Sequence, residues 1–186
     1  MRLNSTFFHG KDSVSLAQDL LGKVLTKITP HGIISGIINE VEAYREDDEA
    51  SHTFGGKKSS RNEVMFKEAG HLYVYFTYGM YHCMNIVSEK SGYGAAVLIR
   101  SIIPYKGEYL MIENRKWQGK KSSDLTNGPA KVCMAFLITK KDNGINLLEA
   151  NSTIFLEDIG YKVPEIKTSK RIGISRGVDM EWRFCF

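Results

Sequence analysis

The segment His71–Ser88 reads "HLYVYFTYGMYHCMNIVS" and is rich in the aromatic and β-branched residues that favour strands. Its side chains alternate on both sides of "YGM", where a glycine suits a tight turn. We therefore predict a β-hairpin in which Tyr73 and Tyr75 share one face of the first strand and Tyr78 lies at the tip. Core or surface packing is the ordinary use of the two strand tyrosines, whereas a tyrosine at the tip has little core to enter.

Helix and strand patterns surround this hairpin without a regular βαβ alternation. Residues 45–63 form a long polar stretch between them, which is typical of a functional or mobile loop. The mixture predicts one α+β domain spanning residues 1–186. Its further strands are expected at residues 23–28, 32–44, 95–104 and 152–159, and its helices within residues 12–22, 107–117 and 128–138.

Composition restricts the class of protein only mildly. The chain has 186 residues, 42% of them hydrophobic, and a net charge of +4, which allows nucleic acid, an anionic surface or neither as a partner. Three widely spaced cysteines point to free thiols in a reducing compartment. The start of the chain lacks the apolar run of a signal peptide, and no run is long enough to span a membrane. These features predict a cytoplasmic protein without a membrane partner.

The stretch "INEVEAY" places Glu40, Glu42 and Tyr44 on one face of a strand, because residues two apart point the same way. Uninterrupted alternation puts Ile34 and Ile38 on that face too, which predicts that the face is covered. A solvated face is the ordinary alternative for glutamates in a strand. A covered carboxylate can instead act as a general base.

Arg100 interrupts the apolar strand "AVLIRSII" and needs a partner if it is buried. Either Glu40 or Glu42 on a neighbouring strand, or an anionic ligand, would meet that need. By contrast, the four consecutive acids Glu46–Glu49 are expected to form a solvent-facing spacer.

Several classes of site find no support in the sequence. His82 and Cys83 are adjacent in a strand and point to opposite faces, and His52 and His71 lack metal-ligand spacing. There is no glycine-rich phosphate loop and no nucleophile elbow. We therefore expect neither a metal nor a cofactor. The basic stretches "GGKKSSRN", "GKKSS" and "KTSKRIGISR" suit phosphate contacts, although each alone is more often a solvated loop.

Taken together, "VEAYREDDEASH", "MFKEAGHLYVYFTYGMYHCMNIV", "AVLIRSI" and "NGPAKVCMAF" resemble the alkyladenine (3-methyladenine) DNA glycosylase family. The likeness runs from the first predicted helix to about residue 175. It implies a base excision repair enzyme that flips an alkylated purine out of damaged double-stranded DNA and hydrolyses its N-glycosidic bond. It also implies a monomer with a curved, mostly antiparallel sheet, flanking helices and a hairpin over Tyr73–Asn85 that protrudes into the minor groove.

The resemblance also implies a role for each matching residue. Glu42 is the general base that activates water, Arg100 lies near the water and the sugar, and Tyr78 intercalates into the DNA. The base pocket comprises Tyr44, His52, Tyr75 and Asn85, with support from Tyr73, Arg61 and Met65. No lysine is placed as a Schiff-base nucleophile, so a monofunctional enzyme is implied.

Two other classes remain as alternatives. A non-catalytic nucleic-acid-binding module could retain the pocket, and base release by the protein would distinguish it from an enzyme. A module that carries a formyl cofactor on a similar fold is disfavoured, because it explains neither Tyr78 nor Glu42.

Overall fold

The computed structural model describes residues 1–119 and 121–186. In it, the segment 71–88 forms the predicted hairpin, with β3 (Leu72–Thr77) paired antiparallel to β4 (Tyr81–Val87). Tyr78 adopts a left-handed backbone conformation (φ 50°) at the turn between the two strands. Its side chain is 83% exposed at the tip of the hairpin.

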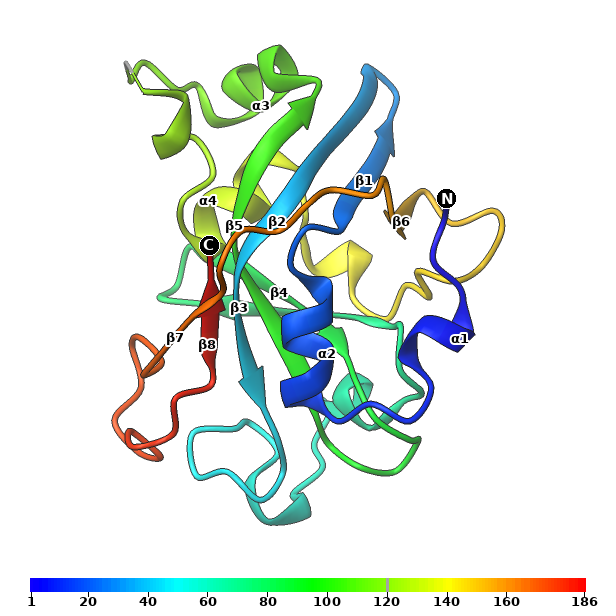
Figure 1. The fold of residues 1–186 in the computed structure, drawn as a ribbon, viewed down its shortest axis with the longest axis vertical. Coiled ribbons are helices and arrows are strands. Elements are labelled where there is room, and N and C mark those ends of the chain that lie inside the picture. The colour runs from blue at the N-terminus through cyan, green and yellow to red at the C-terminus, as the bar shows by residue number, and fades with distance from the viewer. Residues whose placement is uncertain (120) are drawn as a thin grey trace.

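The hairpin belongs to a single antiparallel sheet of eight strands (Figure 1). The main path runs in the order β3-β4-β5-β2-β1-β6, and β8 pairs with both β2 and β7. The long β2 therefore meets β1, β5 and β8 along its length. The remaining strands are β1 (Val24–Thr29), β2 (Gly32–Tyr44), β5 (Ala96–Lys106), β6 (Ile154–Glu157), β7 (Lys167–Ser169) and β8 (Arg183–Cys185).

Short helices flank this sheet, and the predicted α+β class is confirmed. They are α1 (Ser5–Phe8), α2 (Ser13–Leu20), α3 (Glu108–Arg115) and α4 (Pro129–Ala135). The side chain of Asp12 caps α2 by accepting from the Ser15 N–H at 2.8 Å, and a proline begins α4. Helix α2 packs on β2 and β5, whereas α4 packs on β4 and β5. In the described residues, no helix has the length and apolar character that a membrane crossing requires.

The structure differs from the predicted elements in several details. Helix α4 ends at Ala135 instead of residue 138, where Leu137 turns into the left-handed region at φ 51°. The short helix α1 and the short strands β7 and β8 were not anticipated. Both strands are only three residues long. β7 pairs with β8, and β8 pairs with β2 through contacts distant in sequence.

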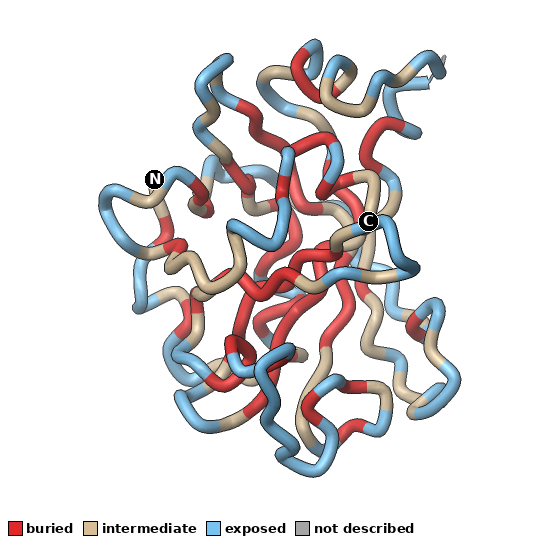
Figure 2. Tube along the Cα trace, turned by 180° about the vertical axis from the view of Figure 1, so that it is seen from behind, coloured by how far each residue is buried: buried red, intermediate tan, exposed pale blue. Residues whose placement is uncertain are grey.

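The main core lies on one face of the sheet, where the buried side chains alternate with those of the opposite face. In β3 the core residues are Leu72 and Val74, whereas Tyr73 joins a second, smaller cluster. In β5, Val97 and Ile99 face the core, whereas Leu98 lines a cavity. Figure 2 shows the buried segments concentrated along the central strands. One face of these strands thus forms the main core, and the other face lines a cavity.

An irregularity in β2 decides which of its residues face the core. The pairing of β2 with β5 shifts register at Ile38/Glu40 and again at Glu40/Val41. As a consequence Ile38 and Val41 both join the main core, although they are three residues apart. The expectation that Ile34 and Ile38 share the face of Glu42 is therefore wrong, because the bulge exchanges the two faces within the strand.

The loop over residues 45–63 is also more ordered than expected. Asp48, Ser51 and Thr53 are buried, and the Asn62 side chain donates to the carbonyls of His52 and Lys57 at 2.8 and 2.9 Å. A 3-10 turn occupies part of the segment. The loop is thus held by its own polar side chains.

Candidate active site

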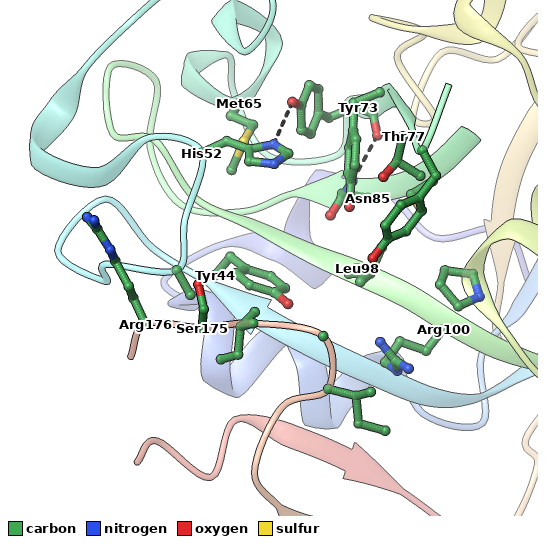
Figure 3. Close-up of a pocket in the computed structure, with 18 of the residues that line it drawn as sticks. Tyr44, His52, Met65, Tyr73, Thr77, Asn85, Leu98, Arg100, Ser175 and Arg176 are labelled. Atoms are coloured by element: carbon green, nitrogen blue, oxygen red, sulfur yellow. Dashed lines mark hydrogen bonds between the residues drawn. The ribbon is translucent and has the colours of Figure 1, made fainter. Parts of the chain in front are cut away.

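A cavity of about 470 Å³ opens on the face of the sheet opposite the main core, within the range typical of small-molecule pockets (Figure 3). Strands β2 to β5, the loop after β2 and the segment before β8 supply its walls. Of the residues expected at the site, nine line this cavity: Tyr44, His52, Arg61, Met65, Tyr73, Tyr75, Tyr78, Asn85 and Arg100. The structure therefore brings together residues from four separate parts of the sequence.

The tenth expected residue, Glu42, lies directly behind this wall. Its side chain is completely buried and contacts residues that line the cavity. The Tyr44 hydroxyl donates to Oε2 at 2.8 Å, the Ile172 N–H donates to Oε1 at 2.8 Å, and Arg100 Nη1 lies 3.2 Å from Oε2. All of these contacts are donors, the arrangement that an ionised, acceptor-only carboxylate takes.

Arg100 links this carboxylate to a second one. Its Nε donates to Glu40 Oε1 at 2.8 Å, and the Arg183 Nε donates to the same oxygen at 2.7 Å. Burial raises the pKa of Glu40, but the hydrogen bonds from Arg183 and Arg100 outweigh it, so the pKa lies below its usual range. The partner of Arg100 left open by the sequence is thus both Glu40 and Glu42.

Aromatic rings form another wall of the cavity. The rings of Tyr73 and Tyr75 stack at 5.6 Å between centroids, and His52 meets Tyr75 edge-on at 4.6 Å. His52 Nδ1 also shares a 3.0 Å hydrogen bond with the Tyr73 hydroxyl. Partial burial and the nearby Arg61 guanidinium lower the pKa of His52, which favours its neutral form at neutral pH.

Three tyrosines of the cavity, Tyr44, Tyr73 and Tyr75, keep their hydroxyl protons at neutral pH. Burial raises the pKa of Tyr73 to about 12. It raises the pKa of Tyr44 still further above the ordinary value, and the adjacent Glu42 carboxylate adds to that rise. Burial likewise raises the pKa of Tyr75. The cavity therefore presents neutral phenol rings to a ligand, and these can stack on a planar base.

The remaining expected residues occupy distinct positions around the cavity. Asn85 is buried, and its Nδ2 donates to the Tyr73 carbonyl at 3.2 Å. Met65 is buried beside the aromatic wall, and the Arg61 guanidinium lies 5.9 Å from the centre of the Tyr75 ring. Tyr78 lines the edge of the cavity from the exposed hairpin tip.

One wall of the cavity was missed by the sequence reasoning. The segment of residues 172–176 lines it, within the connection between β7 and β8. The residues belong to "KTSKRIGISR", which we interpreted only as a basic stretch that suits phosphate contacts. That interpretation is wrong for Arg171, whose side chain is buried and bonded to a carboxylate. In "GKKSS", Lys120 lies outside the described residues.

The acidic stretch Glu46–Glu49 is not a uniform spacer. The Asp48 side chain is buried against Arg171, and Glu46 Oε2 accepts from the Gly94 N–H at 2.8 Å. Glu49 lines the cavity. A run of acids gives no sign of this sorting, because the partners lie far away in the sequence. Over residues 1–119 and 121–186, no group of three His, Cys, Asp or Glu side chains is placed to hold a metal ion.

Comparisons with known proteins show the family of the chain. The family model described as "Methylpurine-DNA glycosylase (MPG)" matches residues 6–186. Proteins named "Putative 3-methyladenine DNA glycosylase" are similar over nearly their whole length. One from Clostridium botulinum is 40% identical, covering 99% of this chain and 95% of that protein. One from Methanocella arvoryzae is 42% identical, covering 95% and 88%. The chain belongs to the methylpurine-DNA glycosylase family, as the resemblance predicted.

Proposed function

We propose that the chain removes alkylated purines from duplex DNA by hydrolysing the N-glycosidic bond, with Glu42 as the general base. The observation that carries this proposal is the arrangement of Glu42 directly behind an aromatic cavity. The carboxylate is fully buried, yet it bonds to Tyr44 and Arg100, which both line that cavity. A purine base stacked on the tyrosine rings that line the cavity would leave its sugar beside the Glu42 carboxylate.

In this mechanism the water oxygen bonds to C1′ of the sugar as the bond from C1′ to the base nitrogen breaks. The electron pair of that bond leaves with the base, and the proton of the water passes to Glu42. The sugar carries positive charge in the transition state, which an anionic carboxylate stabilises. Arg100 holds Glu42 in place and lies at the cavity wall, where it is suited to orient the water.

The aromatic wall supports selection of damaged bases. Many alkylated purines are cationic, and a cation against a tyrosine face gains about 0.5–2 kcal/mol. His52, neutral at physiological pH, and the Asn85 amide can form hydrogen bonds with the edge of a base. The exposed Tyr78 at the hairpin tip is suited to fill the gap that a flipped nucleotide leaves in the stack.

The test is base release from duplexes that each carry one lesion, namely 3-methyladenine, hypoxanthine or ethenoadenine. We expect free 3-methyladenine and an uncut strand with an abasic site, which alkali then cleaves. An undamaged duplex of the same sequence is the control. Strand cleavage without alkali would contradict monofunctional action. If none of the three bases is released, the proposal fails and a non-catalytic binding module becomes the better account.

The partner in this proposal is damaged double-stranded DNA, and no cofactor takes part. The monomeric state and the cytoplasmic location stay predictions from the sequence. Sedimentation of the free protein and of its DNA complex would test the first.

A further inference from the structure

A second buried ion pair, Asp48–Arg171, lies next to the site without lining the cavity. Both side chains are 0% exposed. Arg171 Nη1 bonds to Asp48 Oδ2, and Nη2 bonds to Oδ1 at 2.9 Å, so the contact is bidentate. The guanidinium also donates to the carbonyls of Ala43 at 2.8 Å and Gly177 at 3.1 Å.

The surroundings of this pair are shaped to hold it. The guanidinium carbon lies 4.6 Å from the centre of the Tyr44 ring and 5.3 Å from the Trp182 ring. Gly177 has a left-handed backbone (φ +58°), and a Cβ there would lie 2.5 Å from Asp48 Oδ1. The chain therefore bends closely around the carboxylate at a position that only glycine fills without strain.

The Asp48–Arg171 pair lies next to the two residues that donate hydrogen bonds to Glu42, the proposed general base. Arg171 packs on Tyr44, whose hydroxyl donates to Glu42, and it precedes Ile172, whose N–H donates to the other oxygen of Glu42. Its bond to the Ala43 carbonyl falls between Glu42 and Tyr44 in the strand. Arg171 thus contacts the chain on both sides of the hydrogen-bonded Glu42 carboxylate. The cavity wall that follows it, with Ser175 and Arg176, lies beside Tyr44 in Figure 3.

We propose that Asp48 and Arg171 are positioning residues for base excision. They hold the segment of residues 170–177 against β2, and thereby keep Tyr44 and Ile172 in hydrogen-bonding contact with Glu42. This inference rests on the proposed function of Glu42. Neither residue touches the cavity, so the pair acts on the rate of the chemical step more than on the capture of DNA.

The variants Asp48→Asn and Arg171→Lys weaken the pair with little change in volume. Asparagine removes the negative charge, whereas lysine keeps the positive charge and loses the planar fork. Asp179→Asn is the matched control, because the Lys170–Asp179 pair (3.1 Å) belongs to the same part of the chain but has side chains that are 60% and 92% exposed. The variants are compared on a 3-methyladenine duplex in single turnover at saturating enzyme, below their unfolding temperatures.

We expect the single-turnover rate of Asp48→Asn and Arg171→Lys to fall by about tenfold or more, because small misplacements of catalytic groups have effects of that size. The dissociation constant for the duplex should change by less than about threefold, a small shift in binding free energy. Trypsin should cut the segment of residues 170–177 faster in both variants, and Asp179→Asn should match the wild type in rate and affinity.

A fall of less than tenfold in the rate of both variants would overturn the inference, as would a loss confined to the dissociation constant. If neither variant folds, the pair is required for the fold as a whole, and a positioning role is likewise overturned. If the wild type itself releases no base, the proposed function fails instead. The trypsin experiment then still decides whether the pair holds the segment.

Discussion

Arg100 and Arg171 each bind a buried carboxylate on or beside β2, Glu42 and Asp48, yet their surroundings differ. Arg100 lines the cavity and contacts Glu40 and Glu42, and Arg183 also bonds to Glu40. Arg171 is enclosed by the rings of Tyr44 and Trp182 and by backbone carbonyls, and its one charged partner among the described residues is Asp48. The first arrangement leaves a charged group within reach of a ligand, whereas the second fixes one segment against another.

The comparison is tested first by separating the two carboxylates around Arg100. Glu42→Gln keeps the volume and removes the charge, so we expect the rate of base release to fall by about 10²–10⁴-fold. That corresponds to about 2.7–5.4 kcal/mol of activation free energy. Glu40→Gln removes a charge from the same strand, but Glu40 bonds to Arg100 and Arg183 and, unlike Glu42, to neither Tyr44 nor Ile172, so we expect a fall of less than about tenfold. Equal losses in the two variants, measured in single turnover, would contradict the assignment.

The sealed pair should matter more for stability than the pair at the cavity. Arg171→Met leaves Asp48 buried without a charged partner, and we expect the free energy of unfolding to fall by about 3–5 kcal/mol. Arg100→Met leaves Glu40 bonded to Arg183, and Glu42 bonded to Tyr44 and Ile172, so about 1–3 kcal/mol is expected. Urea unfolding measures both values. A larger loss of unfolding free energy for Arg100→Met than for Arg171→Met would contradict the view that the Asp48–Arg171 pair matters more for stability.

Tyr78 belongs to the surroundings of neither Arg100 nor Arg171. Its substitution therefore tests DNA binding separately from the chemical step. We expect Tyr78→Ser to weaken binding to a damaged duplex by about 1–3 kcal/mol, the size of a lost aromatic stack. Thermal unfolding should be unchanged, because the side chain is 83% exposed. Tyr109→Ser is the control, since Tyr109 is 63% exposed and does not line the cavity. If both variants bind like the wild type, the proposed wedge is wrong.

The smallest expected effect is on how the free energy of unfolding depends on pH under acidic conditions. The pKa of Glu40 in the folded protein lies below its ordinary value of 4.5, so its contribution to stability is complete above that value. The contribution is lost as the pH falls through the folded pKa, where the unfolded chain binds more protons. Urea unfolding between pH 3 and 6 should therefore show a flatter pH dependence for Glu40→Gln than for the wild type. The same slope of unfolding free energy against pH in both proteins would show that Glu40 does not contribute to the pH dependence of stability.

Local pattern explains which parts of the fold could be predicted. The hairpin, the long strand β2 and the capped helix α2 each have a signal within a few residues, namely alternation, a glycine turn or an Asp12 cap. The bulge at Ile38/Glu40 has no such signal, because register is set by pairing with β5. It reversed the expected face of Ile34 and Ile38 while leaving Glu42 and Tyr44 together.

The site was predicted where residue type and resemblance coincided. Tyr44, His52 and Arg100 lie together as expected, on three segments of the chain. Asp48 and Arg171 were missed because the pair spans 123 positions in the sequence. Each residue stands in a charged stretch, where solvated side chains are the ordinary case. Only the folded structure reveals that one member of each stretch turns inward.

The most direct test of the central claim compares binding and chemistry for Glu42→Gln on one 3-methyladenine duplex. The dissociation constant is measured first, and the single-turnover rate of base release is then measured at saturating enzyme. We predict a dissociation constant within about threefold of the wild type, with a rate lower by about 10²–10⁴-fold. A rate equal to that of the wild type would contradict the role of Glu42 as the base.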